Sequence, residues 1–106
     1  MLAFAALADP TRQRIVEMLA GRELGAGEIA RRFDMTPPAV SQHLRLLRES
    51  GIIAVRRDKQ RRIYTLDPHG LAEIDAWLSR FRRFWSSRLD TLEHELIATD
   101  PNRRSS

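Results

Sequence analysis

The chain opens with a pattern typical of amphipathic helices. Asp9 followed by Pro10 is a helix-start signal, because Asp accepts backbone N–H bonds at the N-cap and Pro fits the first helical position. Apolar residues then recur at helical spacing until Gly21, which predicts a helix over residues 9 to 20. The mostly apolar segment 2 to 8 predicts a short helix that is stable only when packed on something larger.

Two further helices follow, with a short turn between them. Residues 28 to 33 place their apolar side chains on one side of a helix of about two turns. Thr36 and Pro37 repeat the start signal, and the apolar spacing continues, which predicts a helix over residues 37 to 50. Only residues 34 to 36 separate the two, which is the spacing of a helix-turn-helix.

Beyond these helices the pattern becomes that of β-strands. Residues 52 to 55 and 63 to 66 are mainly β-branched, aromatic or otherwise apolar. They flank the polar, basic segment 56 to 62. The sequence therefore predicts a hairpin over residues 52 to 66 with at least five positive charges at its tip.

A long helix is predicted at the end of the chain. Apolar residues recur at helical spacing from Leu71 to Leu96, which predicts one helix over residues 70 to 98. It would reach about 42 Å, whereas a 100-residue globule has a radius of gyration of about 13 Å. Its aromatic residues, Trp77, Phe81, Phe84 and Trp85, would form a large exposed patch on a monomer. Pairing with a twofold-related copy would bury the patch, and an effector pocket between paired helices is the alternative.

Together these elements predict a mainly α fold with a two-stranded β-hairpin. The order α-α-α-α-β-β-α is that of a winged helix-turn-helix, with the hairpin as the wing. We expect one dimeric domain over residues 1 to 98 that combines DNA binding and dimerisation, and a disordered tail over residues 99 to 106.

The charge balance raises nucleic acid on the list of partners. The 106 residues carry 18 Lys and Arg against 14 Asp and Glu, for a net charge of +4. The absence of cysteine excludes disulfides, thiolate metal sites and Cys nucleophiles. No apolar run approaches the roughly 20 residues of a membrane span. We therefore expect a cytoplasmic protein with no membrane partner and no cofactor.

Each part of the predicted fold has a physical role on double-stranded DNA. The major groove admits one α-helix, so polar residues at the exposed start of the 37 to 50 helix can reach base edges. The candidates for base contacts are Thr36, Ser41, Gln42, His43 and Arg45. The wing cations cannot all read sequence, and we expect most to contact phosphates or the minor groove. These are Arg56, Arg57, Lys59, Arg61 and Arg62.

At this point the chain resembles the ArsR-type winged-helix repressors, named for arsenical resistance. Residues 7 to 15 (LADPTRQRI) resemble the opening helix of the family, residues 41 to 53 (SQHLRLLRESGII) its recognition helix, and residues 57 to 66 its wing. The resemblance covers residues 3 to about 80 in order. It implies a homodimeric transcriptional repressor whose first and last helices form the dimer interface. The interface candidates are then Leu2, Phe4, Leu71, Ile74, Leu78, Phe81 and Trp85.

Departures from the family pattern bear on metal sensing. Members that sense thiophilic metals carry two Cys after a Glu-Leu pair, and here those positions are Gly25 and Gly27. A second family site begins with Asp-x-His, which Asp67 and His69 match. Its remaining ligand positions, eleven and fourteen residues beyond His69, hold Arg80 and Arg83, which cannot ligate a cation. We therefore expect no metal site, with His69 a polar residue at a helix start, and leave any small-molecule effector open.

The sequence favours DNA binding over other functional classes. An enzyme is disfavoured because the sequence has no Gly-rich phosphate loop, plausible catalytic triad or metal-ligand cluster. A winged helix used as a protein-interaction module is the stronger rival, although such a module would present apolar residues on its recognition helix. A DNA binder without sequence preference also stays open. For His43, the alternatives are DNA contact or positioning of the recognition helix, and a surface histidine with no role.

Overall fold

The structure, a computed structural model, describes residues 2 to 99. The chain divides into two compact units, one ending at Ile74 and the other beginning at Asp75. The tail for which we expected disorder lies outside the described residues, except that Thr99 ends the last helix. Within residues 2 to 99, no helix has both the length and the apolar character needed to cross a membrane.

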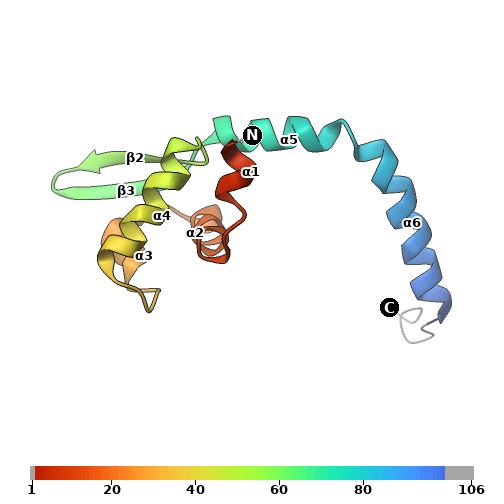
Figure 1. Ribbon diagram of the computed structural model, residues 1–106, viewed down its shortest axis with the longest axis horizontal. Coiled ribbons are helices and arrows are strands. Elements are labelled where there is room, and N and C mark those ends of the chain that lie inside the picture. Colours follow the sequence, from red (N-terminus) through yellow and green to blue (C-terminus); the bar gives the residue numbers. More distant parts are fainter. Residues whose placement is uncertain (1, 100–106) are drawn as a thin grey trace. The chain divides into compact units, whose positions relative to one another are not determined.

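Four helices build most of the first unit (Figure 1). They are α1 (Leu2–Ala6), α2 (Pro10–Gly21), α3 (Ala26–Ala30) and α4 (Pro37–Glu49). The predicted caps of α2 and α4 are confirmed. Asp9 Oδ2 accepts from the backbone N of Arg12 at 3.0 Å, and Thr36 Oγ1 accepts from that of Ala39 at 3.3 Å. The α3 helix begins and ends earlier than predicted, so that six residues rather than three separate α3 from α4.

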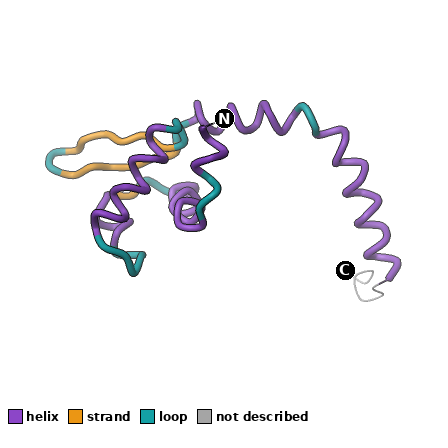
Figure 2. Tube along the Cα trace, viewed as in Figure 1, coloured by secondary structure: helices purple, strands orange, loops and turns teal. Residues whose placement is uncertain are grey.

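A three-stranded antiparallel sheet completes this unit (Figure 2). Its strands are β1 (Leu24–Gly25), β2 (Ile53–Asp58) and β3 (Arg61–Leu66), in the order β1-β3-β2. The predicted hairpin is confirmed, but its strands extend into the segment expected to be a loop. Four of the five wing cations therefore lie on strands, and only Lys59 lies in the two-residue turn. The prediction of two strands missed β1, which is too short to show a periodicity.

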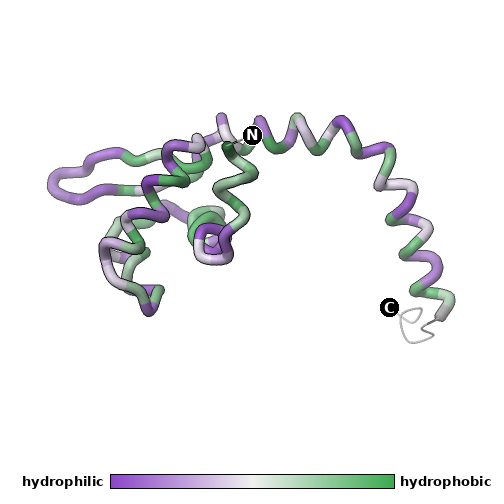
Figure 3. The backbone as a smooth tube through the Cα atoms, in the orientation of Figure 1, coloured by the Kyte–Doolittle hydropathy of each residue, from purple (hydrophilic) through white to green (hydrophobic). Residues whose placement is uncertain are grey.

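The core lies where the four helices meet the sheet. Ile15, Ile29, Leu47, Ile52 and Ile53 are its largest fully buried side chains. Along the hairpin the sequence is apolar where the strands join the core and hydrophilic toward the turn (Figure 3). The exposed wing is thus anchored by its base.

The predicted single helix over residues 70 to 98 is wrong, because the segment forms two helices. These are α5 (Pro68–Ser79) and α6 (Arg82–Thr99). At the break the bonding tightens to i→i−3: Arg80 N donates to Trp77 O and Phe81 N to Leu78 O, at 3.2 and 3.1 Å. The expected span of about 42 Å assumed a continuous helix, and therefore no longer applies.

The start of α5 is fixed to the first unit by a close backbone approach. Gly70 N donates to Gly51 O at 2.9 Å, and Gly51 itself has φ +80°. A Cβ on Gly70 would lie 2.4 Å from Gly51 O. Leu71 and Ile74 pack against the core from the same helix.

Candidate nucleic-acid interface

The α4 helix has one buried stripe and one open face. Val40, Leu44 and Leu47 are at most 3% exposed and hold the helix on the core. Because these positions share one side of the helix, the intervening polar residues face solvent. Ser41, Gln42 and Arg45 are exposed. Thr36 is exposed as well, and its hydroxyl keeps a donor while its oxygen caps the helix.

A shallow hollow of about 190 Å³ joins this open face to the wing. Ser41, Arg45 and Arg48 line it from α4, and Arg62 and Tyr64 line it from β3. Arg48 and Tyr64 were not among the predicted site residues. Arg48 follows Ser41 and Arg45 at helical spacing and was recognisable in the sequence, whereas Tyr64 is brought in by the sheet. Arg45 also lies 3.8 Å from Glu49, but both side chains are more than half exposed, so this pair is weak.

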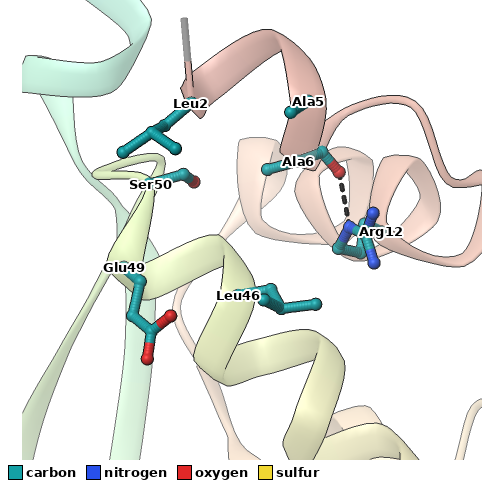
Figure 4. A pocket seen from close by; sticks show the side chains of 7 residues that line it. All are labelled: Leu2, Ala5, Ala6, Arg12, Leu46, Glu49 and Ser50. Atoms are coloured by element: carbon teal, nitrogen blue, oxygen red, sulfur yellow. Dashed lines mark hydrogen bonds between the residues drawn. The ribbon is translucent and has the colours of Figure 1, made fainter.

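His43 departs from the prediction of an exposed base contact. Its side chain is 18% exposed and faces α2, with Nδ1 3.2 Å from Arg12 Nη1 and 3.8 Å from Asp9 Oδ2. Arg12 in turn donates from Nε to the carbonyl of Ala6 in α1 at 2.6 Å (Figure 4). Through Arg12 and His43, this network of side-chain contacts links α1, α2 and α4. Of the two functional alternatives for His43, this geometry favours positioning of the helix over contact with bases.

The strand register divides the wing cations between two faces. Directly paired residues of antiparallel strands share a face, and successive residues of a strand alternate. Arg57 is paired with Arg62, on the face where Arg62 meets α4. Two like charges directly opposite each other are destabilising, which favours a polyanionic partner on this face. Two of the five wing cations predicted to contact DNA, Arg56 and Arg61, form ion pairs with Glu23 and Glu28.

Neither of the family's two metal sites has its full set of ligand residues here. Gly25 belongs to β1 and Gly27 to α3. Asp67 Oδ1 accepts from the backbone N of His69 at 3.0 Å, and this bond is the main reason that the pKa of Asp67 is lowered. His69 Nδ1 lies 3.0 Å from the same oxygen. Across residues 2 to 99, no three His, Asp or Glu side chains gather as a metal site would require.

The predicted dimer residues of the first unit lie at two places. Leu2 is 72% exposed, and with Leu46 it lines an apolar hollow of about 250 Å³ between α1 and α4 (Figure 4). Phe4 is half-buried. Leu71 and Ile74 are partly buried against the core and offer only part of their surface to a partner.

In the second unit the predicted dimer residues form part of an aromatic row. The centroid of the Phe81 ring lies 4.8 Å from the ring centroid of Trp77 and 6.3 Å from that of Trp85. Phe81 is exposed, whereas Leu78 and Trp85 are half-buried. In the same unit Arg82 Nη2 lies 3.6 Å from Asp75 Oδ1.

Comparisons with known proteins identify the family of this chain. Residues 9 to 55 match the model of the family "Bacterial regulatory protein, arsR family". The chain is 48% identical over 79 residues to the HTH-type transcriptional regulator Rv2034 of Mycobacterium tuberculosis, covering 74% of each chain. It is 35% identical over 78 residues to the transcriptional repressor SdpR of Bacillus subtilis, covering 74% of this chain and 87% of SdpR.

A solved structure extends the similarity to the whole fold. A possible transcriptional regulator for arsenical resistance superposes with a TM-score of 0.71 at 38% identity, covering 90% of this chain and 96% of the other. The winged helix-turn-helix prediction is confirmed, and the matched proteins are regulators rather than enzymes. This chain belongs to the arsR family of bacterial regulatory proteins and is a DNA-binding transcriptional regulator.

Proposed function

We propose that this protein is a homodimeric, sequence-specific repressor that binds an imperfect palindrome overlapping a promoter and does not respond to metal ions. The observation that carries the proposal is the hollow in which the polar face of α4 meets the basic face of the wing. An α-helix enters the major groove, and a wing beside it reaches the flanking backbone. A regulator of this kind acts in the cytoplasm, where the chromosome lies.

The residues on this surface divide by chemistry. Thr36, Ser41, Gln42 and Arg45 are proposed to face base edges, and Gln42 can form two hydrogen bonds with an adenine edge. Arg48, Arg57, Lys59 and Arg62 are proposed to hold phosphates, because they line the wing side or its turn. His43 is proposed to position α4. The absence of metal response is supported by Gly25 and Gly27 at the positions of the family's thiolate ligands.

The dimer would place two recognition helices in successive major grooves. Half-sites on one face of DNA are separated by about 34 Å. The exposed apolar residues of α1, α5 and α6 are proposed to form the interface, since a chain of this size gains stability by burying such a surface. Repression is supported by the printed name of the relative SdpR.

The decisive experiment is a fluorescence-anisotropy titration against the duplex upstream of the protein's own gene and a scrambled duplex, over a series of salt concentrations. We expect a preference of about 10³-fold or more for the native duplex. Equal affinities with a steep salt slope would instead describe a binder without sequence preference or a wrongly chosen operator. Absence of binding at low salt would overturn DNA binding and promote the protein-interaction module.

Two variants separate base readout from backbone contact in this assay. Gln42→Ala should cost about 1–3 kcal/mol at the preferred site and relax the base preference there. Arg62→Ala should weaken all duplexes alike and lower the salt slope by about 1. An unchanged preference for the first variant, or an unchanged slope for the second, would remove that residue from its proposed role.

A further inference from the structure

The wing carries two kinds of cation. Arg57 and Arg62 lie opposite each other on the face that meets α4. Arg56 and Arg61 occupy the other face by the alternation of the strands, although Arg56 also borders a hollow with Arg57 and Arg62. Arg56 is paired with Glu23, which precedes β1, and Arg61 with Glu28 in the first turn of α3. In the chain, the glutamate of one pair precedes β1 and the glutamate of the other follows it.

The pair between Arg61 and Glu28 is built into the backbone. Glu28 Oε1 accepts from the backbone N of Gly25 at 3.1 Å and from Arg61 Nη2 at 2.9 Å. The hydrogen bond from Gly25 is the largest cause of the lowered pKa of Glu28, and the charge of Arg61 adds to it. Because the carboxylate is already fixed at the start of α3, Arg61 meets an ordered acceptor rather than a free side chain.

Gly25 leaves the space in which the Arg61 guanidinium lies. A Cβ at this position would lie 2.9 Å from Arg61 Nη2 and 3.3 Å from Glu28 Oε1. The φ of Gly25 is −75°, which any residue can adopt, so the backbone conformation does not require glycine here. What glycine supplies is room for the guanidinium over β1.

The second pair joins Glu23 to Arg56 near the base of β2. Arg56 Nη1 donates to Glu23 Oε2, but both side chains are 53% exposed, so this is the weaker of the two pairs. Glu23 directly precedes β1, which pairs with β3 at Leu24 and Gly25. Two glutamates separated by β1 thus hold two arginines of the wing.

We propose that Glu23 and Glu28 are positioning residues that keep Arg56 and Arg61 out of phosphate contact, leaving Arg57, Lys59 and Arg62 as the wing's DNA-facing cations. This inference rests on the proposed function. By neutralising two of five charges, the glutamates limit the sequence-independent part of the affinity and leave base readout a larger share of the total. They also fix which face of the hairpin turns toward α4.

The first variant, Glu28→Gln, tests the role of the charge: it keeps an acceptor for the backbone N of Gly25 and loses the negative charge. Salt-dependent anisotropy with the scrambled duplex should show a slope steeper by about 0.9 for one released phosphate contact. Between 50 and 200 mM salt, the variant's affinity should therefore fall by a factor about three- to fourfold larger than the factor for wild type. Glu17→Gln, an exposed site on α2 with the same charge change, is the matched control. Glu23→Gln repeats the test at the second pair.

A second test changes no charge and displaces the Arg61 guanidinium by the volume of a methyl group alone. Gly25→Ala should push Arg61 off Glu28 and steepen the slope as Glu28→Gln does. Gly27→Ala is its control, because a Cβ there meets only Arg31 Nη1, at the ordinary distance of 3.6 Å. Thermal unfolding of each variant verifies that the hairpin is still folded before the slopes are compared.

A double-mutant cycle with Arg61→Ala separates the possible outcomes. In the wild type Arg61→Ala should leave the slope unchanged, and in the Glu28→Gln protein it should restore the wild-type slope. The inference alone is overturned if wild-type protein binds DNA but Arg61→Ala lowers its slope by about 1, or if Glu28→Gln matches Glu17→Gln. If wild-type protein binds no duplex at low salt, the proposed function fails and the inference falls with it.

Discussion

The two units of the chain treat their apolar side chains in opposite ways. Within residues 2 to 99, every buried hydrophobic residue lies between Ala3 and Tyr64. Along α6 most large apolar residues are exposed: Phe84, Leu89, Leu92 and Leu96 are between 44% and 61% exposed, whereas Trp85 is half-buried. The first unit buries most of its apolar side chains against its own chain, with Leu2 and Leu46 as exposed exceptions. The second unit also carries apolar residues at helical spacing, so this spacing alone does not tell which surface will cover a helix.

The largest effect should come from the core of the first unit. Leu47 is fully buried under α4, and Leu47→Ala should lower the free energy of unfolding by about 2–5 kcal/mol because it leaves a cavity. Leu46→Ala, one position along the same helix and 36% exposed, is the control and should cost clearly less. Urea unfolding measures both. Similar losses at both positions would erase the distinction between buried and open faces of α4.

The next effect should come from the backbone contact that fixes α5. Gly70→Ala places a Cβ 2.4 Å from Gly51 O, and the three nearest atoms are all backbone, which has little room to yield. We expect a destabilisation of about 1–3 kcal/mol, as for other overpacked sites. Gly21→Ala, whose Cβ would meet nothing within 4 Å, should be neutral or slightly stabilising. Equal midpoints of thermal unfolding for the two variants would contradict the close approach.

A smaller effect, confined to assembly, is expected in the second unit. Trp85→Asp puts a charge into the proposed interface and should raise the dimer dissociation constant at least tenfold, or about 1.4 kcal/mol. Sedimentation velocity over a concentration series measures it, with Asp90→Asn as an exposed control on the same helix. The far-ultraviolet circular dichroism spectrum of the protein should keep the signal expected for a folded first unit. A dimer that survives the change would place the interface elsewhere.

The smallest expected effect is a pH dependence in the first unit. Asp9 has a lowered pKa, chiefly because its carboxylate accepts from the backbone N of Arg12. Its stabilisation is therefore present above the carboxyl's unfolded pKa and is lost as pH falls through the folded pKa. Asp9→Asn keeps a cap acceptor without a titrating group, so its stability should fall less between pH 6 and pH 3. Parallel acid dependence in variant and wild type would mean that this cap does not contribute.

Local signals in the sequence predicted the local features well. Asp9 with Pro10, and Thr36 with Pro37, located the starts of α2 and α4, because a cap is a property of neighbouring residues. Gly51 ended α4 with the positive φ that favours glycine. The hairpin was recognisable for the same reason, since its strands and turn are contiguous.

Features that depend on distant residues were missed. The break between α5 and α6 contains neither Gly nor Pro, so its sequence carries no helix-ending signal. The pairing of Glu23 and Glu28 with wing arginines joins positions 33 apart in the chain. His43 was placed on the open face because its partners Asp9 and Arg12 come from another helix. In each case the sequence supplied the residue type, and only the fold supplied its neighbour.

The turn of the wing has a consequence for anyone who redesigns this protein. Lys59 has φ +59°, a conformation that glycine adopts without steric cost. An engineer seeking a more rigid hairpin would therefore replace it with glycine, and would delete one of the cations proposed to hold DNA. An engineer seeking tighter binding would keep the lysine and accept its sterically less favourable backbone conformation. Position 59 is thus a place where thermostability and affinity cannot be optimised by the same substitution.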